Sequence, residues 1–228
     1  MARKPPPPRG PQLELAGALC VAFVNTAAAG PKNRQQGVAG YDELVSWGQQ
    51  AGVLSTLEAE RLRRVAGDRP GEAEAAFARA ARLRFDLARI FLATAKEESP
   101  PRDALDALNA ALAEALTGLR LVPGEQGLTW GWGGDENALD RVLWPVLHSA
   151  GETLVAAAGR PQVRQCAAKG CALYFVDRSA SRQQRWCDMK TCGSRAKALR
   201  YYYRTGQSDR DEKKRNLGVW RKRRPRKA

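Results

Sequence analysis

The sequence predicts a mainly α-helical protein with a small β-hairpin, in which a helical amino-terminal domain is followed by a small ββα-like module. Apolar residues recur at helical spacing through much of residues 41–155, the pattern of amphipathic helices. Between Leu119 and Trp132 the spacing shortens to two, which is typical of strands. Four of the five cysteines lie within residues 166–192, as in small modules that need disulfide bonds or a bound metal ion to fold. Hydrophobic residues make up 43% of the 228 residues, enough for a packed core.

The carboxy-terminal part of the chain carries its whole excess of positive charge. Residues 1–162 hold 18 basic and 19 acidic side chains, whereas residues 163–228 hold 20 basic and 5 acidic ones. This asymmetry is typical of contact with nucleic acid or an anionic membrane, although an arginine-rich solvated surface is the alternative. No run approaches about 18 uninterrupted apolar residues, so we expect no membrane partner. His148 is the single histidine, which excludes sites built from several histidines.

We divide the chain into four segments. Residues 1–12 contain the run PPPP and are expected to form a disordered, basic arm. Residues 13–160 form the helical domain, and residues 163–205 form the cysteine-rich module. Residues 206–228 are polar and basic, and we expect a disordered tail there.

The apolar run over residues 15–24 has two interpretations. It follows Arg3, Lys4 and Arg9, so it resembles a secretory signal. Glu14 at its start and the prolines among the basic residues argue against a signal, and we favour a segment of the helical domain.

Helix signals follow one another along this domain. Ser55, with Glu58 three residues later, forms a capping box that starts a helix. Pro100 ends the long helix and separates it from the next helix along the chain. The expected helices cover 41–50, a segment from Ser55 onward, about 72–98, a segment from Pro101 or Arg102 onward, and a last one that Asp135 or Asn137 caps and Pro145 kinks.

The cysteines form two short-spaced pairs. CAAKGC and CDMKTC each enclose four residues, and fifteen residues separate Cys171 from Cys187. Two such pairs predict one zinc ion held by Cys166, Cys171, Cys187 and Cys192, because a tetrahedral zinc site takes four thiolates. Two disulfides, an iron–sulfur cluster and unligated thiols are the less favoured alternatives. Four protein ligands leave no open position for a substrate, so the zinc is expected to be structural. Cys20 is interpreted as a small buried hydrophobe.

The module around these cysteines is expected to present cations. We predict strands at 173–176 and 183–186 and a helix over about residues 193–204. Ala196, Leu199 and Tyr203 share one helix face, which we expect to pack over the zinc and the hairpin. The candidate nucleic-acid contacts on the helix and the hairpin are Arg178, Arg182, Arg185, Arg195, Lys197, Arg200, Tyr201 and Arg204.

Residues 163–204, VRQCAAKGCALYFVDRSASRQQRWCDMKTCGSRAKALRYYYR, resemble the CGNR zinc finger family. The match includes Arg185-Trp186-Cys187 and Cys192-Gly193, with Ser194 where the family has asparagine. Serine also caps helices, so we expect the fold to survive that change. The preceding region is similar to the ABATE domain on the residues Phe23-Val24-Asn25-Thr26. The resemblance implies a stress-linked bacterial transcription regulator, cytoplasmic and associated with the nucleoid, and makes residues 15–26 part of the domain.

Three functions remain to be compared. We favour a DNA-binding transcription regulator, with the helical domain as a sensing or dimerisation unit, and leave a homodimer and a small-molecule effector open. An RNA-binding or ribosome-associated protein is the alternative. An enzyme is not expected, because no nucleophile–base pair or phosphate loop is recognisable. Asn25 and Thr26 are candidate ligand contacts in the helical domain, or else polar groups that satisfy a buried loop.

Overall fold

The computed structural model describes residues 16–27, 37–124, 127–156 and 163–205. By its contacts the chain divides into an amino-terminal unit, Met1–Cys187, and a carboxy-terminal unit, Asp188–Ala228. The arm expected at residues 1–12 and the tail expected at 206–228 lie outside the described residues.

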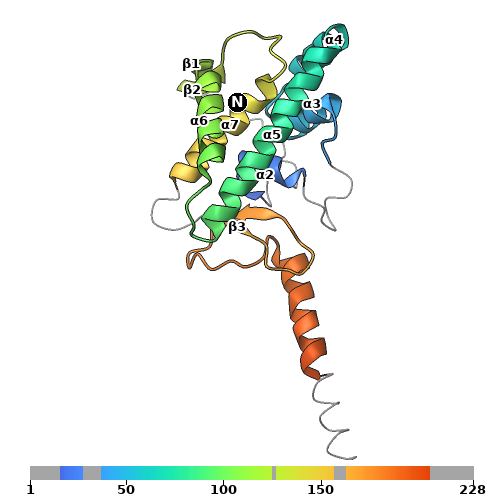
Figure 1. The fold of residues 1–228 in the computed structure, drawn as a ribbon, viewed down its shortest axis with the longest axis vertical. Coiled ribbons are helices and arrows are strands. Elements are labelled where there is room, and N and C mark those ends of the chain that lie inside the picture. Colours follow the sequence, from blue (N-terminus) through green and yellow to red (C-terminus); the bar gives the residue numbers. More distant parts are fainter. Residues whose placement is uncertain (1–15, 28–36, 125–126, 157–162, 206–228) are drawn as a thin grey trace, which may run out of the picture. The chain divides into compact units, whose positions relative to one another are not determined.

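The amino-terminal unit is mainly helical, as expected (Figure 1). Its helices are α2 (Leu19–Asn25), α3 (Tyr41–Gln50), α4 (Thr56–Asp68), α5 (Pro70–Ala95), α6 (Arg102–Leu116) and α7 (Trp144–Val155), with a short 3-10 turn at Arg141–Leu143. Among the described residues, none of the helices combines the length and the apolar character needed to cross a membrane.

The predicted helix starts are confirmed where the sequence carries explicit capping residues. Helix α4 begins after Ser55, whose Oγ accepts a hydrogen bond from the Glu58 backbone N–H at 3.2 Å. The Glu58 carboxylate accepts the Ser55 backbone N–H at 2.8 Å, so the capping box is complete. Helix α3 has the predicted bounds.

Three expectations about these helices were wrong because of proline and Asx chemistry. Helix α5 begins at Pro70, since proline is tolerated in the first turn of a helix. Asp135 and Asn137 do not cap α7; the Asp135 carboxylate accepts the Asn137 backbone N–H at 2.9 Å in a local turn. Helix α7 starts at Trp144, so Pro145 lies in its first turn and does not kink it.

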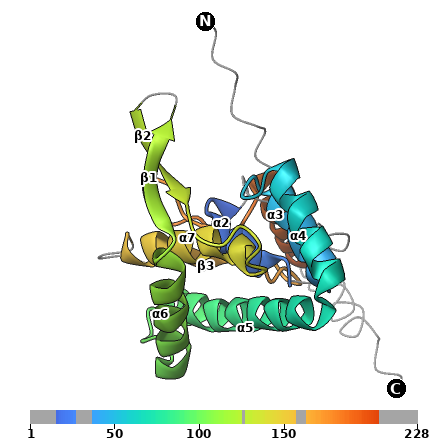
Figure 2. The same cartoon turned by 90° about the horizontal axis from the view of Figure 1, so that it is seen from above.

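The expected hairpin at residues 119–132 is confirmed. Strand β1 (Leu119–Gly124) pairs antiparallel with β2 (Gly127–Trp132), with Leu121 opposite Trp130 and Leu119 opposite Trp132. Figure 2 shows this ribbon standing out beyond the end of α6. Leu121 and Trp130 are more than half exposed. The ribbon contacts α7 through its tryptophans: the ring of Trp132 lies 6.1 Å from that of Trp144, and the ring of Trp130 lies 6.4 Å from that of His148.

Helix α2 lies in the core of the amino-terminal unit. Cys20 is fully buried, and its backbone N–H donates to Ser149 Oγ of α7 at 3.2 Å. Burial raises the pKa of the Cys20 thiol, which agrees with its expected role as a buried hydrophobe. Phe23 packs on Trp47 of α3 with ring centroids 5.2 Å apart. Residues 19–25 are thus part of the domain's packing, as the resemblance implied.

The carboxy-terminal unit starts with a π-helical turn, Met189–Gly193, followed by an α-helix over residues 194–205. Ser194 is the first α-helical residue, and its hydroxyl donates to the Met189 carbonyl at 3.2 Å, back toward the π-helical turn. Leu199 is 40% exposed and Tyr203 is 59% exposed. Packing of these two side chains over the zinc and the hairpin stays a prediction, because the helix and the hairpin belong to different units.

Candidate metal centre and nucleic-acid interface

The cysteine-rich module begins with a short antiparallel sheet. Strand β3 (Val163–Gln165) pairs with β4 (Tyr174–Val176), and Val163 lies opposite Val176. The second strand was expected at residues 183–186, which was wrong. A hydrogen bond to a buried carboxylate determines the path of that segment instead: the Gln184 backbone N–H donates to Asp177 Oδ2 at 3.0 Å. Its Arg185 carbonyl accepts one hydrogen bond, from the Ala167 N–H at 2.9 Å.

Asn25 of α2 ties strand β4 to the helical core. Its Nδ2 donates to the Tyr174 carbonyl at 2.9 Å, and its Oδ1 accepts the Tyr174 N–H at 2.8 Å. The Tyr174 hydroxyl donates to the Ala88 carbonyl of α5 at 3.3 Å. The first strands of the module therefore pack on the helical domain.

Asp177 organises the loop that follows β4. Its side chain is completely buried and accepts the Ser179 N–H at 3.0 Å, the Ser179 hydroxyl at 2.6 Å and the Gln184 N–H. The Arg164 guanidinium lies 2.9 Å away. Burial alone would raise the pKa of Asp177, but these hydrogen bonds and the Arg164 charge hold it below its ordinary value. The loop is thus built around an ionised carboxylate.

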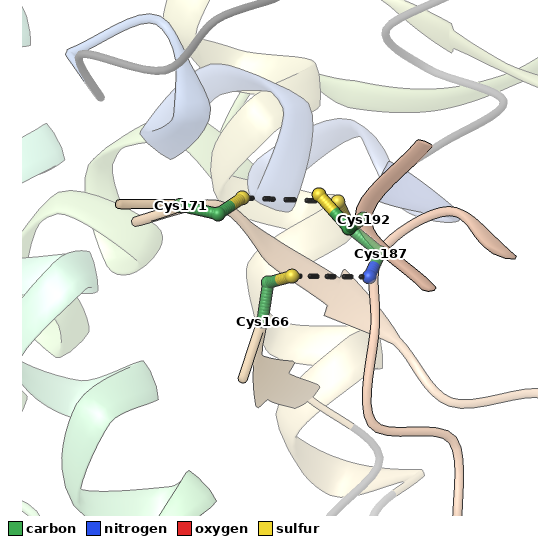
Figure 3. Close-up of side chains that lie close together, drawn as sticks. All are labelled: Cys166, Cys171, Cys187 and Cys192. Carbon is green, nitrogen blue, oxygen red and sulfur yellow. Dashed lines mark hydrogen bonds between the residues drawn. The ribbon is translucent and has the colours of Figure 1, made fainter. Parts of the chain in front are cut away.

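The four clustered cysteines bring their sulfur atoms together (Figure 3). The Sγ atoms of Cys166, Cys171, Cys187 and Cys192 all lie within 4.8 Å of one another. Cys171 Sγ and Cys187 Sγ are 3.9 Å apart, beyond the roughly 2.05 Å of a disulfide bond. Zinc–sulfur bonds of about 2.3 Å place tetrahedral ligands about 3.8 Å apart, so this donor set fits zinc.

Hydrogen bonds around the sulfur atoms favour thiolates. The Cys187 backbone N–H donates to Cys166 Sγ at 3.5 Å. Burial would raise the pKa of the Cys166 thiol, but hydrogen bonds from the backbone of Cys187 and Ala168 and from neighbouring thiols lower it. Gly170, at φ 74°, supplies the left-handed turn between Cys166 and Cys171. Zinc would be held by these four sulfurs and would hold the two cysteine loops together.

The predicted nucleic-acid contacts near the hairpin have local partners. Arg178 donates to the Gly17 carbonyl, and Arg182 donates to the Asp177 carbonyl at 3.2 Å. Arg185 lies over the Trp186 ring, with 5.6 Å between its guanidinium carbon and the ring centroid. Their role in nucleic-acid binding stays a prediction.

The predicted contacts on the helix of residues 194–205 are exposed. Arg195 donates to Cys192 Sγ at 3.6 Å. Arg204 lies over the Tyr201 ring at 5.9 Å, and Tyr201 is 62% exposed. Lys197 and Arg200 are exposed on the same helix.

Both candidate ligand residues of the helical domain are buried. Besides the two bonds of Asn25, the Thr26 hydroxyl donates to the Phe23 carbonyl at 2.7 Å and accepts a hydrogen bond from Arg84 Nη1 at 3.0 Å. These bonds match the alternative in which the two residues satisfy buried structure. Ligand binding by them stays a prediction.

Sequence reasoning missed Arg164 and Asp177 as organising residues. They come together across strands β3 and β4. A three-residue strand carries too little periodicity to be recognised, so no sequence signal connected them.

Comparison with known protein families agrees with this architecture. A helical domain followed by a four-cysteine cluster defines a zinc-finger protein with a helical amino-terminal domain. Residues 17–157 match the ABATE family, described as "Putative stress-induced transcription regulator", and residues 162–205 match the CGNR zinc finger. The chain therefore belongs to the ABATE family and carries a CGNR zinc finger with one structural zinc site. No curated protein matches the chain.

Proposed function

We propose that this protein is a DNA-binding transcription regulator whose zinc finger supplies the DNA contact. The observation that carries this proposal is the exposure of Lys197, Arg200, Tyr201 and Arg204 on one helix directly after the fourth cysteine. These positions are spaced as i, i+3, i+4 and i+7, which puts them on one side of the helix. A row of cations on a helix suits a phosphate backbone or a major groove.

The charge of the whole chain supports a polyanionic partner. Residues 163–228 hold 20 basic and 5 acidic side chains, and the formal net charge of the chain is +14. Contacts between basic side chains and phosphates position a protein on DNA without reading its sequence. Recognition of bases must therefore come from the helix over residues 194–205 or from a second copy of the chain. The regulator acts in the cytoplasm at the nucleoid, and no catalytic role is assigned to it.

The helical domain is proposed to sense a signal or to dimerise. Its link to the first strands of the finger through Asn25 and Tyr174 supports a role in transmitting changes from α2 to the cysteine loops. A small-molecule effector and a homodimer both fit this role.

RNA binding is the second candidate function. Tyr201, Tyr202 and Tyr203 are 62%, 70% and 59% exposed. Exposed aromatic rings beside arginines favour stacking on unpaired bases, which RNA offers more readily than duplex DNA.

The test is selection of bound sequences from random duplex DNA with the zinc-loaded full chain, followed by competition with structured RNA. Duplex binding by about five phosphate contacts gives a slope of roughly −4.5 for log affinity against log salt. Cys187→Ser is the control without an intact site. Recovery of a DNA motif supports the proposal. A flat salt response, or displacement of DNA by a roughly tenfold lower concentration of RNA, contradicts it.

A further inference from the structure

The first turn of the exposed helix brings a guanidinium against a zinc ligand. Arg195 Nη2 lies 3.6 Å from Cys192 Sγ, within hydrogen-bond distance of a sulfur acceptor. The two residues are three positions apart. Side chains on an α-helix lean toward its amino-terminal end, so a residue in the first turn reaches back over the residue three before it.

The backbone of the turn before the helix holds Cys192 in place beside Arg195. Cys192 and Gly193 close the π-helical turn, and both are buried. A Cβ at Gly193 would lie 3.0 Å from Met189 Sδ, so the backbone passes close to that side chain. The Gly193 N–H donates to the Asp188 carbonyl at 3.0 Å, and Asp188 accepts the Lys190 N–H at 2.9 Å. The turn that carries Cys192 is therefore ordered by its own hydrogen bonds before the helix begins.

The charge of the zinc site favours a hydrogen-bond donor next to Cys192 Sγ. Four thiolates around one divalent ion carry a net negative charge, and cysteine sulfur is a weak hydrogen-bond acceptor unless it is ionised. A cationic N–H donor beside one thiolate offsets part of this charge and orients the ligand, as donors around metal ligands commonly do.

We propose that Arg195 is a positioning residue of the zinc site, which holds the Cys192 thiolate through its guanidinium and slows the loss of the metal. This role needs no nucleic acid and therefore stands apart from the proposed function. It reassigns Arg195 from the predicted phosphate contacts to the surroundings of the zinc.

Lys197 is the matched control. It carries the same charge, is exposed on the same helix and lies two residues further along. Two residues correspond to roughly 200° around a helix, so Lys197 points away from the side that Arg195 occupies. Removing either residue changes the net charge equally, and only Arg195→Ala removes the contact with sulfur.

The experiment measures the rate at which zinc leaves the full-length, zinc-loaded protein for an excess of a chromogenic chelator. Arg195→Ala is expected to release zinc on the order of ten times faster than the parent chain, the typical effect of removing a partner of a metal ligand. Lys197→Ala is expected to stay within about twofold of the parent. Equal release rates for the two variants overturn the proposal, because they leave only a general effect of charge.

A spectroscopic measurement separates positioning from loss of the fold. In the cobalt-substituted protein, Arg195→Ala is expected to shift the thiolate-to-cobalt charge-transfer band, whereas Lys197→Ala leaves it in place. Arg195→Lys keeps the charge but not the planar fork, and it is expected to restore the release rate only in part. Full restoration by lysine, or an unshifted cobalt band in Arg195→Ala, contradicts a directed N–H···S bond.

Discussion

The side-chain amide of Asn25 pairs with both main-chain groups of Tyr174, at 2.9 Å and 2.8 Å, much as a neighbouring strand would. Asn25 ends helix α2, and Tyr174 opens strand β4 of the zinc module. The amide satisfies two buried backbone groups that no other strand reaches in the described part of the sheet. The helical domain and the first strands of the finger thereby share one set of buried hydrogen bonds.

Replacement of Asn25 by alanine is expected to lower the free energy of unfolding by about 3 kcal/mol. The reason is that one buried N–H and one buried C=O lose their partner, and each unsatisfied group is costly. Urea unfolding followed by tryptophan fluorescence measures the change. Asn109→Ala, on the exposed side of α6, is the control and is expected to stay within about 0.5 kcal/mol of the parent. Equal stability of the two variants would show that the Asn25 amide contributes nothing.

Replacement of Gly48 by alanine is expected to destabilise the helical domain by about 1–3 kcal/mol through overpacking. A Cβ at this position would meet Val142 Cγ2 at 2.6 Å and Leu54 Cδ1 at 3.1 Å. Gly67 lies in α4, and a Cβ added there would have nothing within 4 Å, so Gly67→Ala is expected to raise stability by up to about 1 kcal/mol. Thermal melts of both variants test the pair. A stabilised Gly48→Ala protein would contradict the close packing of α3 on residues 54 and 142.

Replacement of Asp177 by asparagine is expected to cost about 2 kcal/mol at neutral pH, because the carboxylate accepts several buried hydrogen bonds. The pKa of Asp177 is lower in the folded than in the unfolded chain, so its ionisation stabilises the fold above the unfolded-state pKa of about 3.9. That stabilisation disappears as the pH falls through the folded-state pKa.

The stability difference between the parent chain and Asp177→Asn is therefore expected to be constant between about pH 5.5 and 7.5 and to narrow below about pH 4. Urea midpoints measured across this range provide the test. A difference that changes near neutral pH would mean that another group titrates in its place.

Removal of the metal is expected to unfold the cysteine loops and leave the helices. The hydrophobic core consists mainly of side chains from α2 to α7 together with Val163 and Tyr174 of the short sheet, and none of the four clustered cysteines belongs to it. In chelator, amide exchange of Cys166, whose N–H donates to the Leu173 carbonyl at 2.9 Å, is expected to lose protection. The far-ultraviolet dichroism of α2–α7 should persist. Metal analysis should give one zinc per chain and none in Cys187→Ser; retained protection of Cys166 without metal would speak against a structural ion.

Replacement of Lys197 by alanine is expected to weaken duplex DNA binding and to reduce the steepness of its salt dependence by about 0.9, the contribution of one phosphate contact. Lys96→Ala, which removes an exposed cation next to the end of α5, serves as the control and should leave the slope unchanged. Fluorescence anisotropy at several salt concentrations gives both slopes. Identical slopes for the two variants would contradict a contact between Lys197 and a DNA phosphate.

The sequence predicted those parts of the molecule whose signals are local. The capping box at Ser55, the period-two spacing around Trp130 and the paired cysteines each act within a few residues, and the structure has each of them in place. Strand β3 escaped prediction because it is three residues long and its partner lies beyond the first cysteine pair. Residues 183–186 were expected to return as a strand after the turn at 178–182, but the carboxylate of Asp177, seven positions before Gln184, determines their path.

The role of buried polar residues was the hardest to predict. Asn25 was expected to be a ligand contact or a polar group that satisfies a buried loop, but its partner, Tyr174, is 149 positions away and could not be named. Leu199 and Tyr203 have the spacing of a buried face, and yet both are exposed. Periodicity identifies residues that share a side of a helix; it does not tell what that side meets.

The exposure of the helix over residues 194–205 also has an evolutionary consequence. Substitutions of exposed residues away from caps and buried partners usually change stability by less than about 0.5 kcal/mol. Tyr202 and Leu199 can therefore be exchanged with little penalty to folding, whereas Cys192 and Gly193, both buried, cannot. Chains that inherit this scaffold are therefore expected to diverge faster at Leu199 and Tyr202 than at Cys192 and Gly193, without loss of the folded protein.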